Sequence, residues 1–224
     1  MIRDSLGVGI ATGLYGTSFG AVSVAAGLSV AQTCALSLVM FTGASQFALV
    51  GVLAAGGTPL SSALTALLLG SRNTLYGLRV GPLLGYRGVR RVAGAHLLLD
   101  ESTAMSINRP DRTLARVGFV ATGLSVFVLW NLFTLLGAVA GEALGDPETY
   151  GLDAAVGAAF LALLWPRLSD SVNRGVALAA AALALTLVPF TPAGLPVLAA
   201  GGVALLVGLL SKHEDPTEFP EARR

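Results

Sequence analysis

The feature that most constrains this chain is the absence of any Asp, Glu, Lys, Arg or His between Ser5 and Ser71. Two further charge-free runs extend from Val117 to Gly141 and from Gly175 to Ser211. Each run is long enough for a transmembrane helix, which needs about 20 apolar residues to cross the hydrocarbon core. These runs predict that the chain folds in lipid.

Composition supports this inference. Apolar residues make up 54% of the chain and charged residues 12%, and the mean hydropathy is +0.75, whereas soluble domains carry about 25% charged residues. The sequence therefore predicts an all-α, polytopic integral membrane protein. We expect residues 1–211 to form one transmembrane transporter domain and residues 212–224 a polar cytoplasmic tail.

Several classes of function have no signature in the sequence. The net charge of +1 provides no basic stripe for nucleic acid. The single cysteine, Cys34, excludes an internal disulfide or a multi-thiolate metal site. No H-E-x-x-H motif or P-loop is present, so we expect neither an enzyme nor a cofactor or metal. We interpret "MIRDSLGVG" as part of a retained first helix, although "SVA" at 23–25 loosely resembles a signal-peptide cleavage site.

Turn-like stretches divide the chain into about seven crossings. Basic residues place 107–116, 167–174 and the tail in the cytoplasm by the positive-inside rule, with the acidic loop 142–153 and "PFTPAGLP" outside. The prediction is a multi-pass protein of the bacterial cytoplasmic (inner) membrane with a cytoplasmic C-terminus. Helices are expected near 5–27, 31–55, 60–82, 90–106, 114–141, 153–168, 174–189 and 195–211.

The first half of the chain conflicts with the same rule. A helix that crosses at 90–106 would place Arg87, Arg90 and Arg91 outside. A broken or re-entrant segment between 60 and 106 would remove this conflict, and "YGLRVGPLLGYRG" contains suitable helix breakers.

The first predicted helix carries a stripe of glycines. Gly9, Gly13, Gly16 and Gly20 recur at i, i+4, i+7 and i+11, so they share one face without side chains. A neighbouring backbone can pack closely on such a face. An interior position for this helix is also favoured by its polar residues, Thr12, Tyr15, Thr17 and Ser18.

Polar residues interrupt the next apolar run at "FTGASQFALVG". The amide of Gln46 needs partners at this depth, since unmet polar groups in hydrocarbon cost several kcal/mol. Two interpretations stay open. Either Gln46 bonds a neighbouring helix, or Gly43 and Ala44 open the helix and expose backbone groups to a substrate.

Arg72, Tyr76 and Arg79 recur at i, i+4 and i+7 in "LLLGSRNTLYGLRVG", so they share one face if this segment stays helical. A charged side chain within the membrane costs roughly 2.5–3.5 kcal/mol and usually lines a cavity or pairs with another charge. The alternative is that both arginines extend to the headgroup region.

Two adjacent carboxylates, Asp100 and Glu101, stand in "LLLDESTAMS". Helical neighbours point about 100° apart, so the two are not expected to face one spot. His96 lies at i−4 from Asp100, which suggests a His–carboxylate proton relay. The remaining acid would then pair with Arg72 or Arg79 across a cavity. The alternative is a helix end with solvated acids at the cytoplasmic surface.

Three stretches together resemble the AzlC family of branched-chain amino acid permeases, also described as the large subunit of branched-chain amino acid exporters. They are "GLYGTSFGAVSVAAGLSVAQTCALSLVMFTGASQFALVG", "SRNTLYGLRVGPLL" and "LLLDESTAMS". The resemblance covers about residues 5–211 and is densest before 106. It implies a secondary transporter that exports Val, Leu and Ile, with Met as a further candidate, and a small hydrophobic AzlD-type membrane subunit as partner.

The resemblance is carried by specific positions. Phe19 and Gly20 match the family's "FG", Gly43 to Phe47 match its "AGASQF" apart from Thr42, and Asp100 and Glu101 match its acidic pair. His96 has no counterpart in this pattern.

The chain departs from the family at "LLLGSRNTLYG". The family's Asn–x–Arg–His type pattern keeps Arg72 here, but Gly70 stands in the Asn position and Asn73 in the His position. If those two polar groups bind substrate in relatives, substrate choice or coupling differs in this protein.

A zwitterionic amino acid needs donors for its carboxylate, acceptors for its ammonium and an apolar pocket for its side chain. We expect Arg72 or helix-terminal N–H groups near 43–46 to hold the carboxylate, and Asp100 or Glu101 to hold the ammonium or carry the coupling proton. Phe41 and Phe47 are expected to line the pocket. The expected substrate-binding residues are Gly43, Ser45, Gln46, Phe47, Arg72 and Tyr76, and the expected coupling residues are Asp100, Glu101 and His96.

Two other classes of function remain as alternatives. A pore or channel for another small solute would transport without coupling to a proton gradient. A non-transporting membrane scaffold would use its buried polar residues only for helix association.

Overall fold

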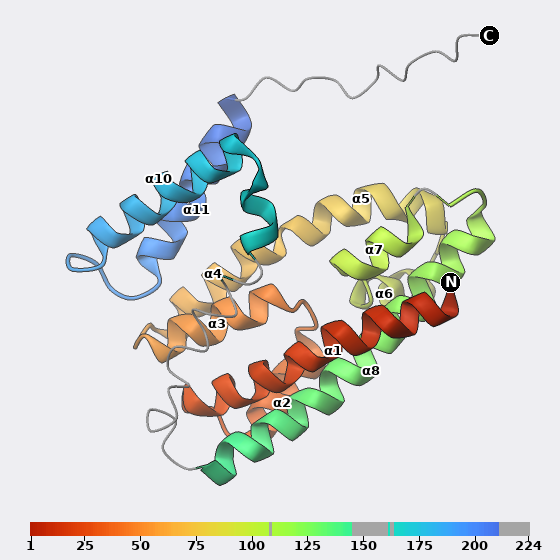
Figure 1. Ribbon diagram of the computed structural model, residues 1–224, viewed down its shortest axis with the longest axis horizontal. Coiled ribbons are helices and arrows are strands. Elements are labelled where there is room, and N and C mark those ends of the chain that lie inside the picture. Colours follow the sequence, from red (N-terminus) through yellow and green to blue (C-terminus); the bar gives the residue numbers. More distant parts are fainter. Residues whose placement is uncertain (108, 145–160, 162–163, 211–224) are drawn as a thin grey trace.

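The structure of the chain is a computed structural model that describes residues 1–107, 109–144, 161 and 164–210 (Figure 1). All regular secondary structure in these residues is helical, which confirms the predicted all-α class. The elements are α1 (Ile2–Ala25), α2 (Val30–Val39), α3 (Ala44–Ala54), α4 (Pro59–Gly70), α5 (Arg72–Leu84), α6 (Val89–His96), α7 (Asp100–Ser106), α8 (Arg112–Leu144), η2 (Trp165–Ser169), α10 (Ser171–Leu187) and α11 (Leu195–Leu210).

Two long apolar helices, α1 and α8, lie side by side and run in the same direction (Figure 1). Gly9 of α1 faces Ser125 of α8, and Gly20 faces Ala138 further along. With 24 and 33 residues, α1 and α8 are the described helices that are long and apolar enough to cross a membrane individually. Together they provide the frame for the rest of the fold.

The glycine stripe of α1 packs directly on the backbone of α8, as predicted. A Cβ atom at Gly16 would lie 2.5 Å from the carbonyl oxygen of Trp130, and one at Gly20 would overlap the carbonyl of Thr134. Buried hydroxyls bind the same two helices together: Thr122 donates to Ser5 Oγ at 2.9 Å, and Ser125 donates to the Ser5 carbonyl at 2.9 Å. Without side chains between them, the two helices make close contact.

Three of the predicted helical segments are each broken in the middle. The predicted helix 31–55 is divided into α2 and α3, 60–82 into α4 and α5, and 90–106 into α6 and α7. The break expected between 60 and 106 is therefore confirmed, at Ser71 and again at 97–99, whereas continuity over 31–55 is wrong. An apolar run of this kind does not by itself reveal an interruption.

Specific hydrogen bonds stabilise two of these breaks. Gly43 takes a left-handed φ of +62°, and its N–H donates to Gln46 Oε1 at 3.0 Å. Leu99 is extended, and its N–H donates to Ser102 Oγ at 2.9 Å. In both cases the side chain of the third residue of the new helix accepts a hydrogen bond from the backbone amide of the residue just before that helix, as in a capping box.

The helices α2 and α3 form a hairpin that enters the molecule partway and turns back. Ser37 of α2 lies 3.4 Å from Thr134 of α8, and the Phe41 ring lies 5.0 Å from Phe127, so α2 runs antiparallel to α8. The outer ends of α2 and α3 both lie at the end of the molecule opposite the N-terminus (Figure 1).

The helices α6 and α7 form a second hairpin, which enters from the other end. Tyr86 lies beside Arg116, the His96 ring lies 5.6 Å from Phe127, and a Cβ at Gly118 would overlap the carbonyl of Met105. The chain therefore goes inward along α8 and returns. Between the two hairpins, α4 and α5 together lead from one end of the molecule to the other (Figure 1).

This second hairpin removes the conflict with the positive-inside rule. Arg116 donates to the Leu84 carbonyl at 2.7 Å and lies 5.5 Å from the centre of the Tyr86 ring. The loop that follows, with Arg87, therefore lies at the same end of the molecule as the beginning of α8. A re-entrant segment between 60 and 106 leaves these arginines on one side.

The helices α10 and α11 pack against each other, and α11 packs against α4. A Cβ at Gly194 would lie 2.8 Å from Ser61, and one at Gly201 would lie 2.5 Å from Leu68. Most of the predicted helix 153–168, most of the loop 142–153 and the tail 212–224 lie outside the described residues. The count of about seven crossings stays a prediction.

Candidate functional site

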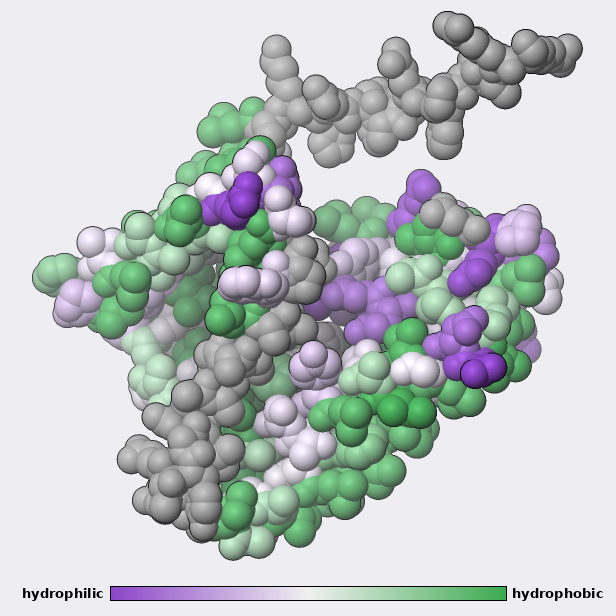
Figure 2. Space-filling view, in the orientation of Figure 1, coloured by the Kyte–Doolittle hydropathy of each residue, from purple (hydrophilic) through white to green (hydrophobic). Residues whose placement is uncertain are grey.

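The three helix breaks meet at one cavity of about 160 Å³ between α1 and α8. A cavity of about this size accommodates a small molecule such as benzene. Hydrophilic residues gather in the hollow between α1 and α5, whereas the outer faces of the helices are mainly apolar (Figure 2). The cavity is lined by Thr12, Tyr15, Phe41, Thr42, Gly43, Ala44, Phe47, Arg72, Asn73, Leu99, Asp100, Glu101, Val126 and Trp130.

The cavity lies near the middle of the long helices. Thr12 and Tyr15 are close to the centre of α1, which spans Ile2–Ala25. On α8, Trp130 lies about 21 Å along the helix from Arg116 at 1.5 Å per residue. A central cavity formed by broken helices is the usual position of a substrate site in secondary transporters.

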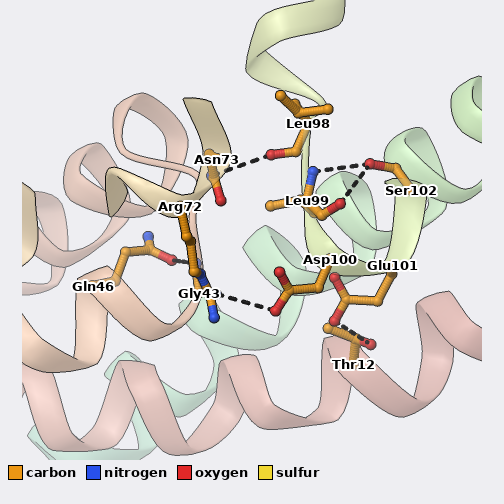
Figure 3. Close-up of polar contacts among 10 residues, drawn as sticks. All are labelled: Thr12, Gly43, Gln46, Arg72, Asn73, Leu98, Leu99, Asp100, Glu101 and Ser102. Atoms are coloured by element: carbon orange, nitrogen blue, oxygen red, sulfur yellow. Dashed lines mark hydrogen bonds and ion pairs between the residues drawn. The ribbon is translucent and has the colours of Figure 1, made fainter. Parts of the chain in front are cut away.

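Arg72 and Asp100 form an ion pair across two of the breaks (Figure 3), with Arg72 Nη2 3.2 Å from Asp100 Oδ2. Each side chain keeps about a third of its surface exposed, at 32% and 34%. Arg72 therefore does line a cavity and pair with an acid, as its position in an apolar segment predicted. Its partner is Asp100, whereas the sequence analysis paired Asp100 with His96 and left Glu101 to bind an arginine.

Glu101 lies beside Asp100 but contacts a different helix. Thr12 Oγ1 of α1 donates to Glu101 Oε1 at 3.3 Å, and the two acids turn toward different partners in Figure 3. Both nevertheless line the same cavity, so the expectation that they would not share one spot is wrong. The cavity surrounds the beginning of α7, and side chains 100° apart at a helix end both reach it.

His96 does not share a face with Asp100. Helix α6 ends at His96 and α7 begins at Asp100, so the i, i+4 relation that suggested a relay does not apply. The His96 ring instead lies 5.9 Å from Phe41 and 5.6 Å from Phe127. Neither His96 nor Tyr76, which follows Arg72 by one helical turn, is part of the cavity lining.

Gln46 bonds a neighbouring helix, as the first interpretation predicted, and the helix is opened at Gly43. The Gln46 amide group donates to the Leu36 carbonyl of α2 at 3.4 Å and accepts from the Gly43 N–H, at the point where the helix is opened. Gln46 and Ser45 are fully buried behind the lining, and the Ser45 hydroxyl has no hydrogen-bond partner. Gly43 and Phe47 do line the cavity.

The beginning of α3 faces the cavity through Gly43 and Ala44. The first amides of a helix have no partner within it, and they carry a partial positive charge that favours anions. The break at Gly43 therefore places the positive end of a helix at the cavity, while the Gly43 amide itself donates to Gln46.

Trp130 is a site residue that the sequence did not indicate. It is 3% exposed, and its Nε1 atom is buried without a hydrogen-bond partner. Arg72 Nε is also buried without a partner. A tryptophan in an apolar run gives little local signal of function, because the cavity beside it is made by distant segments. Both Trp130 and Arg72 line the cavity, so these two donors are candidates to bind a polar group there.

Part of the cavity wall is apolar. Phe41, Phe47, Leu99 and Val126 contribute to it, and each is at most 5% exposed. The Phe47 ring lies 6.2 Å from the Trp130 ring at nearly right angles. Phe41 and Phe47 thus occupy the positions in the lining that the sequence predicted.

Comparison with known proteins identifies the family of this chain. Residues 7–144 match the family described as AzlC protein, and they include every residue of the cavity lining. No solved structure matches the chain.

Three relatives match over most of their length. An uncharacterized membrane protein of Archaeoglobus fulgidus is 31% identical over 191 residues, which cover 84% of each chain. The inner membrane protein YgaZ of Escherichia coli is 29% identical over 213 residues, covering 90% of this chain and 84% of the relative. An uncharacterized membrane protein of Helicobacter pylori is 25% identical over 181 residues, covering 77% and 78%. The predicted membrane protein with a transport-type role is therefore supported, and the chain belongs to the AzlC family.

Proposed function

We propose that this protein is a secondary transporter that exports branched-chain amino acids, in the first place Val, Leu and Ile, through the central cavity. The observation that carries the proposal is the combination of two unpaired buried donors, two carboxylates and an apolar wall in one space. These are the groups that a zwitterion with an apolar side chain requires.

The carboxylate of the substrate is assigned to the donor side of the cavity. Trp130 Nε1 and Arg72 Nε supply unpaired donors, and the guanidinium of Arg72 supplies positive charge. The amides at the beginning of α3 add the helix-terminus interaction that transporters use for carboxylates.

The ammonium group is assigned to the acidic side, at Asp100 and Glu101. Asp100 is already neutralised by Arg72, whereas Glu101 accepts a hydrogen bond from the neutral hydroxyl of Thr12. Glu101 is therefore the better candidate to carry a coupling proton, because a carboxylate without a cationic partner at this depth gains most from neutralisation.

The apolar wall supports selection of a branched aliphatic side chain. Phe41, Phe47 and Val126 present hydrocarbon surface to the cavity. The volume of about 160 Å³ favours small aliphatic groups over large aromatic ones.

Orientation and partnership complete the proposal. The end with Arg87, Arg112 and Arg116 is assigned to the cytoplasm by the positive-inside rule, and we propose that the C-terminus lies on the same side. A small hydrophobic AzlD-type membrane subunit is proposed as the partner, as the family resemblance implies.

The test is efflux of labelled leucine and valine from dipeptide-loaded cells, with and without the small subunit, before and after collapse of the proton gradient. Efflux that requires the gradient supports the proposal. Efflux that ignores the gradient would instead indicate a pore, and no efflux of either amino acid in any arm would overturn the substrate assignment.

A matched pair of variants links the activity to the cavity. Asp100→Asn is expected to abolish gradient-driven export, whereas Asp4→Asn, at an exposed acid near the beginning of α1, is expected to leave it unchanged. Equal export by both variants would show that the cavity is not the site.

A further inference from the structure

A second and larger cavity, of about 700 Å³, lies between α5, α6 and the beginning of α8. Its lining includes Gly81, Tyr86, Arg91 and Phe119. Gly81 faces open space, because a Cβ there would meet no atom within 4 Å. The proposed binding of substrate in the central cavity makes no use of this space.

One thin partition separates the two cavities. Asn73 lines both of them, Leu98 lines the larger one, and the next residue, Leu99, lines the central one. Asn73 Nδ2 donates to the Leu98 carbonyl at 3.3 Å (Figure 3). The partition is therefore one side chain and the turn between α6 and α7.

The larger cavity reaches the basic end of the molecule. Tyr86 and Arg91 lie at its outer part, and the Arg116 guanidinium covers the Tyr86 ring at 5.5 Å. Asn73 lies at its inner part, next to Arg72 of the ion pair. The space thus leads from the cytoplasmic end, as assigned above, to the edge of the substrate site.

We propose that the larger cavity is the cytoplasmic entrance for the zwitterionic amino acid, and that substrate passes from it into the central cavity between Asn73 and Leu98. This inference rests on the proposed export function. The hydrogen bond that closes the partition is long and joins neutral groups, which makes it weaker than a charge-assisted bond. That contact holds the α6–α7 turn near Asn73, and Asp100 follows the turn on the side of the central cavity. Displacement of the turn would therefore open the partition and move Asp100 of the ion pair at the same time.

Thiol labelling tests the entrance directly. Cys34 is the single cysteine and lines neither cavity, so Cys34→Ala gives a background without thiols. In this background Gly81→Cys places a thiol in the larger cavity, and Gly7→Cys places one on the exposed face of α1, where a Cβ also meets no atom within 4 Å. Thr74→Cys, at an exposed residue of the same cavity, is a second position if Gly81→Cys fails to fold.

The reagent is a membrane-impermeant, positively charged methanethiosulfonate, applied to inside-out and right-side-out vesicles. We expect the thiol in the cavity to react from the cytoplasmic side, and its modification to abolish most leucine efflux. We expect Gly7→Cys to keep its efflux after the same treatment. Three results would overturn the proposed entrance: reaction of the thiol only from the outside, no reaction at all, or full leucine efflux after complete modification.

The design distinguishes this inference from the proposed function. If the unmodified chain exports leucine and modification at residue 81 or 74 leaves that export intact, the entrance is wrong and the transport function stands. If the unmodified chain exports no branched-chain amino acid, the proposed function fails and the entrance fails with it.

Discussion

The guanidinium of Arg72 lies 3.2 Å from the carboxylate of Asp100, and each residue is the first of its helix, α5 and α7 respectively. The pair therefore joins the middle of the broken α4–α5 segment to the tip of the α6–α7 hairpin. It lies at the cavity and couples two of the three breaks, so movement of either element alters the charge balance of the site.

The ion pair predicts a non-additive effect on stability. Asp100→Asn leaves the Arg72 charge unpaired in a partly buried position, which is expected to cost about 1–3 kcal/mol, between the values for exposed and buried pairs. The double variant Arg72→Gln/Asp100→Asn is expected to recover part of this loss in stability, because it removes both charges and leaves none unpaired. Thermal unfolding in detergent measures the cycle, and additive losses would show that the contact contributes nothing.

Glu101→Gln is expected to separate substrate movement from its driving force. The amide keeps the shape of the carboxyl group and still accepts a hydrogen bond from Thr12, but it cannot take up or release the coupling proton. Leucine exchange across proteoliposomes should persist, while accumulation driven by a pH gradient should be lost. Glu142→Gln, at an exposed acid near the end of α8, is the control. Gradient-driven accumulation by Glu101→Gln would assign the proton to another group.

Gln46→Leu is expected to destabilise the protein by about 1–3 kcal/mol, because the partly buried Gly43 amide loses the fully buried side chain that accepts from it. The chain contains a close control. Gln32 accepts from the Ser29 amide at 2.8 Å in the same capping arrangement, but at an exposed site where water replaces it. Gln32→Leu should therefore cost much less in the same unfolding measurement. Equal losses would mean that burial at the break is unimportant.

Gly16→Ala tests the close packing of α1 on α8. The new methyl group would lie 2.5 Å from the Trp130 carbonyl oxygen, so the helices must separate, at a cost of about 1–3 kcal/mol. Gly7→Ala, on the exposed face of the same helix, meets no atom within 4 Å and is expected to be neutral or slightly stabilising. The difference between the two melting temperatures is the measurement, and no difference would contradict the packing.

Trp130→Phe removes one buried donor while keeping an aromatic ring in the cavity. Loss of one hydrogen bond of about 0.5–1.5 kcal/mol is expected to weaken leucine binding roughly two- to twelvefold. The chain has a second tryptophan, the exposed Trp165, so Trp165→Phe is the matched control. That control variant also leaves Trp130 as the single tryptophan, and its fluorescence should change when leucine binds. Unchanged affinity in Trp130→Phe would remove this donor from the site.

Several parts of the site follow from local sequence. Arg72, Asp100 and Glu101 are charged residues in apolar surroundings, and Gln46 is a buried amide, so each had to find a partner or a cavity. The glycine stripe of α1 likewise predicts a close neighbour. In each case the residue type alone is informative. A charged or amide group is costly to bury in an apolar segment, and a row of glycines leaves room for a neighbouring backbone.

Other parts do not follow from local sequence. The relay between His96 and Asp100 assumed one continuous helix, and the chain is not helical from Leu97 to Leu99. Trp130 and Asn73 become site residues only because breaks in distant segments come to lie beside them. Spacing along a helix predicts neighbours only while the helix lasts.

The sequence by itself determined that this protein folds in lipid as helices, because long charge-free runs and the need to satisfy every backbone group are properties of each segment alone. Only the tertiary structure decided where those helices break and that the breaks together form a central cavity. The amides freed at Gly43 and Leu99 are satisfied by the side chains that follow them, but the cavity between them exists because α1 and α8 hold three separate segments at one depth. That convergence depends on contacts between residues far apart in the chain, which no local pattern records.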